Sequence, residues 1–212
     1  MGAKTTMFVV ASGDAKPLLA GNPKLDRNAT LQSLAEYFPG QRFTETGQGS
    51  LDDTYVTSED EVYIGDFGSV LVMASVEFAH DRPSEIDPHF FKVAGSRSVY
   101  THSMHSAVDF LAFSYRKQGQ LVRSLSLAPD SGVMEDTGTR LSFEEPFWAG
   151  DHPVDDPEDL ADPEYEPYPF AFHPLELGEA VLSEFFGYQL EGSIDTSMLD
   201  ASSVPLLIFK RA

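Results

Sequence analysis

Cysteine does not occur anywhere in the 212-residue sequence, which excludes disulfide bonds, thiolate metal sites and cysteine nucleophiles. Long hydrophobic runs are absent as well. The apolar run at residues 7–10 is too short for the core of a signal peptide, and no stretch approaches the roughly 20 residues of a transmembrane helix. We therefore expect a soluble protein of the cytosol that is not inserted in a membrane.

Basic residues are missing from one long part of the chain. The whole sequence carries 34 Asp and Glu against 14 Lys and Arg, a formal net charge of −20. Residues 141–209 contain 16 Asp and Glu but no Lys or Arg, whereas residues 1–140 contain 18 acidic and 12 basic residues. Binding to nucleic-acid phosphates or anionic lipids requires clustered Lys and Arg, so we expect neither partner. A basic partner protein, a metal ion, mimicry of a nucleic acid and solubility alone remain as explanations.

Sequence motifs that fix a reaction are also missing. The chain has no Gly-x-Ser-x-Gly, no phosphate-binding or dinucleotide-binding glycine motif, no His-Glu-x-x-His and no EF-hand loop. The sequence therefore assigns neither a reaction nor a cofactor by motif.

Length and periodicity favour one globular domain over residues 1–212. Apolar patterns predict strands at residues 5–11, 42–46, 61–64, 69–78, 99–102, 107–115, 120–127 and 204–209, and helices at 27–38, 83–94 and 174–186. The run at 5–11 is apolar on both faces, which predicts a central strand, whereas Pro205 predicts an edge position for the last strand. Successive hairpins favour an α+β fold with a mixed, mostly antiparallel sheet flanked by about three helices.

Residues 151–169 have no periodic pattern. They contain eight Asp and Glu, five Pro and no Lys or Arg, which predicts an irregular acidic loop. The residues that we expect to contact a partner lie in this loop and just before it: Trp148, Asp155, Asp156, Glu158 and Asp159.

His102 and His105 form a His-x-x-His pair that could hold a metal ion if both rings shared one face, as on a helix. In a strand, residues three apart point to opposite faces. The surrounding sequence predicts a strand, so the pair could share a metal only if a break at residues 103–106 turned both rings inward. The other interpretation places one histidine in the core or at a turn.

Glu144 and Glu145 precede the single tryptophan, Trp148. Beside an apolar wall, a carboxyl group of this kind has a raised pKa and can serve as a general acid. The structural alternative makes the glutamates part of a first helical turn and Trp148 a core anchor.

His173 comes directly before a predicted helix that opens with Pro174 and has Glu176 in its first turn. This spacing is that of a helix cap. The functional alternative places His173 at a pocket edge, as a base or a metal ligand.

Several segments together resemble a family of uncharacterised actinobacterial proteins that is known only as a domain of unknown function. The segments are MGAKT at 1–5, YTHSMHSAVDFLAF at 100–113, RSLSLAPDSGVMEDTG at 123–138, LSFEEPFWAG at 141–150 and FHPLELGEAVLSEFFG at 172–187. The resemblance implies an actinobacterial, cytosolic, single-domain protein. It transfers no activity, ligand or catalytic residue.

Two functions follow from these patterns. The first is a binding or regulatory module whose acidic C-terminal face engages a basic partner protein. The alternative is a small-molecule enzyme, a hydrolase or a metal-dependent enzyme, whose pocket would draw on His102, His105, Glu144, Glu145 and His173.

Overall fold

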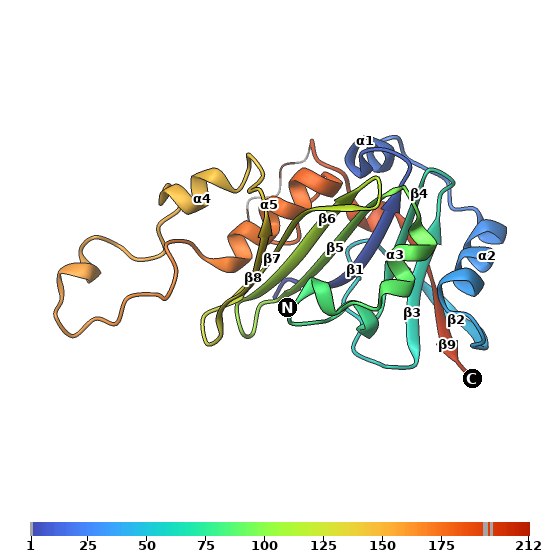
Figure 1. Cartoon of the computed structure of the whole chain (residues 1–212), viewed down its shortest axis with the longest axis horizontal. Helices are drawn as coiled ribbons and strands as arrows, with labels where there is room; N and C mark the ends of the chain where they lie inside the picture. Colours follow the sequence, from blue (N-terminus) through green and yellow to red (C-terminus); the bar gives the residue numbers. More distant parts are fainter. Residues whose placement is uncertain (1, 193–194, 196) are drawn as a thin grey trace.

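One antiparallel sheet runs through the molecule in this computed structural model, which describes residues 2–192, 195 and 197–212 (Figure 1). Within those residues the sheet has nine strands, in the spatial order β2-β9-β3-β4-β1-β5-β6-β7-β8. The strands are β1 (Lys4–Ala11), β2 (Phe43–Ser50), β3 (Glu61–Asp66), β4 (Val70–Ala74), β5 (Ser98–His105), β6 (Phe110–Lys117), β7 (Gln120–Ala128), β8 (Gly132–Gly138) and β9 (Pro205–Arg211).

Strand β1 lies in the middle of the sheet because both of its faces are apolar. It pairs with β4 on one side and with β5 on the other. Phe8 and Val10 point into one hydrophobic core, and Met7 and Val9 point into a second core on the opposite face. The central position predicted for this strand is confirmed.

Helices cover both faces of the sheet. On the face of Met7 and Val9 lie α1 (Ala15–Ala20) and α5 (Pro174–Phe186), whose buried side chains belong to that core. On the other face lie α2 (Arg27–Tyr37) and α3 (Pro88–Ala94). A short helix, α4 (Glu145–Ala149), and the 3-10 turns η1 (Val76–Phe78), η2 (Pro83–Glu85), η3 (Asp159–Ala161) and η4 (Ala201–Ser203) complete the elements.

The predicted α+β class is confirmed, and three details differ from the sequence prediction. All strand pairings are antiparallel, and the part of the chain that the structure describes has five α-helices where about three were expected. The two extra helices, α1 and α4, have only six and five residues, too few for a helical period to be visible in the sequence. The helix predicted over residues 83–94 begins only at Pro88, as α3, and residues 83–85 form the separate 3-10 turn η2. Helix α3 begins there because Asp87 caps it, with its side chain accepting from the His89 backbone N–H at 2.8 Å.

The edge position predicted for the last strand is wrong. Strand β9 lies between β2 and β3. Pro205 is tolerated there because it pairs with Ser50 of β2, whereas the pairing of β9 with β3 extends only as far as Leu207. The proline therefore lies at the end of β9, where the strand is paired with β2 alone.

The chain leaves the body of the molecule once, between α4 and α5. Figure 1 shows this segment extending away from the sheet beyond β8 and returning at the start of α5. Among the described residues, none of the helices combines the length and the apolar character needed to cross a membrane.

Candidate functional site

The acidic arm, residues 151–169, is the extended segment that joins α4 to α5 (Figure 1). Its eight Asp and Glu have no Lys or Arg among them. Three apolar side chains of the arm are also uncovered: Val154 is 36% exposed, Leu160 53% and Tyr165 36%. The arm therefore presents carboxylates and apolar surface together, away from either core.

Asp155 holds the two ends of the acidic arm together. Its carboxylate accepts a hydrogen bond from the Tyr165 hydroxyl at 2.7 Å and from the Tyr168 backbone N–H at 3.1 Å. The hydrogen bond to Asp155 is the main reason that the pKa of Tyr165 is raised to about 12. The Asp155 carboxylate is thus hydrogen-bonded within the arm. Three other residues that we expect to contact a partner lie between these two ends: Asp156, Glu158 and Asp159.

A buried ion pair anchors the start of the arm. Arg123 of β7 and Glu144, the residue before α4, are both 0% exposed, and the guanidinium donates to both carboxylate oxygens at 2.8–3.0 Å. The same carboxylate accepts from the Leu141 backbone N–H at 2.8 Å. Burial alone would lower the pKa of Arg123, but hydrogen bonds to Glu144 and Asp136 outweigh it and raise the pKa. Glu144 faces a guanidinium and does not stand against an apolar wall.

Aromatic rings surround the base of the arm. Trp148 packs edge-on against Phe172 with ring centroids 5.0 Å apart, and the Arg140 guanidinium lies 4.0 Å from its ring centre. Phe147 stacks on His152 at 4.1 Å. Trp148 therefore anchors the arm to the body, and its indole N–H is buried without a hydrogen-bond partner among the residues described.

His173 closes the arm at the start of α5. Its Nδ1 accepts from the Leu175 backbone N–H at 3.3 Å. The capping position predicted for His173 is confirmed, with Leu175 as the donor where a reciprocal contact with Glu176 was expected. Since Nδ1 accepts, Nε2 carries the proton, and it faces the Asp109 carboxylate at 3.5 Å. Tyr168 stacks on the His173 ring at 5.4 Å and donates its hydroxyl to the same carboxylate at 3.3 Å. Burial first, and then Asp109, raise the pKa of Tyr168.

His102 is fully buried between β1 and α5, and both of its ring nitrogens are engaged. Nε2 lies 3.2 Å from the Gly178 carbonyl, which can only accept, so Nε2 carries the proton. Nδ1 then accepts from the Thr5 hydroxyl at 2.7 Å. Burial lowers the pKa of His102 to about 3, so the ring is neutral.

His105 points to the opposite face of β5 from His102, because the two are an odd number of residues apart in one strand. Its ring packs against Tyr55 with centroids 5.5 Å apart, and its Nδ1 accepts from the Ala107 backbone N–H. It borders a cavity of about 390 Å³ together with His80 and Asp81. The strand continues through residues 103–105 without the break that a shared metal site needs.

Glu145 begins α4, one residue after the buried Glu144, and its side chain is exposed. The structure thus places the candidate enzyme residues in separate surroundings: His102, His105, Glu144, Glu145 and His173. Across the described ranges no three His, Asp or Glu side chains gather in a way that could hold a metal ion.

One residue at the base of the arm, Arg123, escaped the sequence prediction. Arg123 is 21 residues from Glu144, and its role becomes visible only once β7 is folded against the segment before α4. Asp109 precedes β6, with a positive φ of 48° in the turn after β5. The strand predicted at residues 107–115 therefore begins later than expected, because the turn that contains Asp109 comes first.

The comparisons with known proteins give a family and no function. No curated protein and no solved structure matches the chain. Residues 5–209 match the model of DUF6928, a family of unknown function, and the match covers nearly the whole chain. The chain therefore belongs to the DUF6928 family.

Proposed function

We propose that this protein is a binding module whose acidic arm engages a basic partner protein. One observation carries the proposal: the arm stands away from the body (Figure 1), and its apolar side chains Leu160, Val154 and Tyr165 are exposed among the carboxylates. Solubility alone would explain the carboxylates, and the exposed apolar side chains add apolar surface that a partner can cover.

Each part of the arm has a role in this proposal. The carboxylates steer a basic partner toward the arm and select against acidic ones. Leu160 lies in the 3-10 turn η3, directly after Glu158 and Asp159, and serves as the apolar anchor that enters a pocket of the partner. Asp155 and Tyr168 hold the arm closed at its base, which lowers the entropy lost on binding.

The enzyme hypothesis has less support. Its five residues do not share a cavity, and two of them, His102 and Glu144, have their hydrogen-bonding groups engaged inside the fold. A binding module needs no convergent acid–base groups, so we prefer it. The proposal keeps the cytosolic location expected from the sequence, which fractionation of cells that express the protein tests directly.

Affinity capture from native lysate tests the proposal. The immobilised protein should retain a basic protein that high salt releases, because exposed charge pairs are screened. Two variants should lose that protein: a triple variant that neutralises the central carboxylates and the single variant Leu160→Ser. The triple variant is Asp156→Asn, Glu158→Gln and Asp159→Asn.

A matched control carries three neutralised carboxylates that are exposed elsewhere on the molecule: Glu59→Gln, Asp60→Asn and Asp130→Asn. The control should keep the partner. Equal loss in the control and the arm variant would mean that net charge alone is responsible. Unchanged capture by both arm variants would remove the acidic arm from the interaction.

A further inference from the structure

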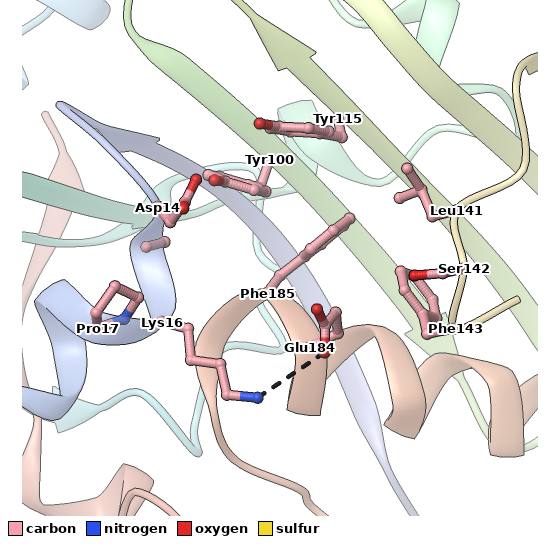
Figure 2. Close-up of a pocket in the computed structure, with 11 residues that line it drawn as sticks. Asp14, Lys16, Pro17, Tyr100, Tyr115, Leu141, Ser142, Phe143, Glu184 and Phe185 are labelled. Carbon is pink, nitrogen blue, oxygen red and sulfur yellow. Dashed lines mark ion pairs between the residues drawn. The ribbon is translucent and has the colours of Figure 1, made fainter.

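A cavity of about 340 Å³ opens on the face of the sheet that carries α1 and α5. Figure 2 shows Tyr100 and Tyr115 lying one over the other along one side and Leu141 to Phe143 along another, with the Lys16–Glu184 pair opposite the tyrosines. The two tyrosines are directly paired residues of β5 and β6, and their rings stack with centroids 4.8 Å apart. None of these residues belongs to the acidic arm.

Four aromatic side chains line this cavity: Tyr100, Tyr115, Phe143 and Phe185. Phe185 of α5 lies 5.0 Å from Tyr100, 5.7 Å from Tyr115 and 5.8 Å from Phe143, measured between ring centroids. The ring of Phe143 stands nearly perpendicular to that of Phe185, at 85°. A small ligand in the cavity therefore meets ring faces and ring edges from four side chains.

The charged groups at the rim favour a cation. Asp14 and Glu184 are negative, and Lys16 is the positive group, 3.9 Å from Glu184 in a pair that is about half exposed. An exposed pair of this kind contributes little and competes weakly with a bound ion. Asp14 precedes α1, but its carboxylate accepts no capping hydrogen bond from that helix. The rim thus carries an excess of one negative charge.

Tyr100 keeps a neutral hydroxyl group over the physiological pH range because its pKa is raised. Burial is the first cause that raises the pKa of Tyr100, and the neighbouring Tyr115 adds to it. A neutral phenol ring has a negative face, which attracts an ammonium group placed over it. Anions, by contrast, meet an acidic rim and a chain with a net charge of −20.

We propose that this cavity binds a small organic cation, an alkylated ammonium ion, whose charged head lies against Tyr115 and Phe185. The cavity volume is at the lower end of the range for small-molecule sites, roughly 300–1,000 Å³, which suits a ligand of this size. Asp14 and Glu184 supply the counter-charge at the rim. The site is independent of the acidic arm and of the partner proposed for it.

Calorimetric titration with choline and with 3,3-dimethylbutan-1-ol tests this site, because the two molecules share a shape and only choline is charged. We expect saturable binding of choline at concentrations below about 10 mM, and binding of the neutral analogue at least about fivefold weaker. Equal binding of both would mean that the cavity recognises apolar shape alone. A titration of choline without saturation would overturn the proposal.

Variants of the cavity separate its aromatic and charged parts. Tyr115→Leu should weaken choline binding by about five- to thirtyfold, whereas Tyr115→Phe, which keeps the ring, should bind as the parent does. Lys16→Gln should strengthen binding and Glu184→Gln should weaken it, each by about two- to fivefold. Because these last two changes are exposed and act in opposite directions, a shared loss of stability cannot imitate them. Unchanged affinity in Tyr115→Leu would contradict the assignment.

Discussion

Arg123 and Glu144 form an ion pair from which solvent is excluded. Each charge is buried, and the guanidinium and the carboxylate satisfy one another through three hydrogen bonds. Removing the charge of Glu144 leaves the buried Arg123 with the partly exposed Asp136 as its counter-charge, and removing Arg123 leaves the Glu144 carboxylate buried without its guanidinium partner. Each change costs more than the pair itself contributes. The stability of this end of the molecule therefore depends on both residues being charged.

Glu144→Gln tests this dependence. We expect the free energy of unfolding to fall by at most about 3–5 kcal/mol, because Arg123 loses its buried counter-charge and keeps the partly exposed Asp136. Urea unfolding measures the loss. The neighbouring Glu145→Gln changes an exposed side chain and should stay within about 0.5 kcal/mol of the parent. Similar losses in both variants would contradict the role given to the buried pair.

The neutral His102 makes stability depend on pH in a predictable direction. Its pKa is lowered from 6.5 to about 3 by burial, so below pH 6.5 the unfolded chain takes up a proton that the native protein does not. This contribution to stability is present above pH 6.5 and is lost as the pH falls, by about 1.4 kcal/mol per pH unit. Between pH 6.5 and pH 5 the loss through His102 amounts to about 2 kcal/mol.

Comparison with the variant His102→Gln isolates the contribution of His102 to the pH dependence of the free energy of unfolding. The variant should lose about 2 kcal/mol less than the parent between pH 6.5 and 5, measured by urea unfolding at each pH. The comparison is needed because Glu179 acts the other way: burial raises its pKa to about 7, so its contribution is lost as the pH rises. An identical pH dependence in both proteins would show that His102 takes up a proton in the native state.

Helix α5 approaches the sheet through a glycine. A Cβ atom at Gly178 would lie 2.5 Å from Sδ of Met104 and 3.3 Å from Cδ1 of Leu111. The missing side chain also lets the Gly178 carbonyl reach Nε2 of His102 at 3.2 Å. The close contact between α5 and strands β5 and β6 thus depends on this one residue.

Gly178→Ala should therefore destabilise the protein by about 1–2 kcal/mol. In an exposed helix the same change stabilises by up to about 1 kcal/mol, but here the added methyl group meets a packed core. The double variant with Met104→Ala creates space for that methyl group, so Gly178→Ala should cost less in this background. If Gly178→Ala stabilises the parent protein, the packing of α5 against β5 and β6 does not require a glycine at this position.

At the scale of the elements, the sequence correctly predicted those strands, helices and caps that depend on the pattern of neighbouring residues. The β6–β7 hairpin, the central β1 and the cap at His173 all follow from the residues within each segment. Strand β8 was not predicted because its acidic residues, Glu135 and Asp136, interrupt the apolar pattern of an edge strand. The position of β9 between β2 and β3 depends on pairing between distant segments, which no local pattern encodes.

The same division applies to the candidate sites. The strand period was enough to separate His102 from His105, since residues three apart in a strand face opposite ways. The Tyr100–Tyr115 stack required the register of β5 against β6, and the Arg123–Glu144 pair required a contact across 21 residues. The acidic composition of residues 151–169 predicted an irregular loop there, but only the structure shows that the apolar side chains of this arm are exposed.

At the scale of the whole molecule, charge and core are separated in space. The acidic arm holds eight of the 34 acidic residues but contributes none of the side chains buried in the two cores. Its ends are joined by the contact between the Asp155 carboxylate and the Tyr168 backbone N–H, 3.1 Å long. The arm between these ends can therefore be removed without separating the strands or the helices.

Replacing residues 157–166 by a short Gly-Ser linker tests this separation. The replacement removes five acidic residues together with Leu160 and Tyr165, and we expect the free energy of unfolding to stay within about 1 kcal/mol of the parent. The shortened protein should lose the basic partner and keep the choline affinity of the intact chain, because the cavity lies on the body. Loss of choline binding or a fall in stability of several kcal/mol would show that the arm supports the fold. A stable shortened protein that still captures the partner would move the binding surface to the body of the molecule.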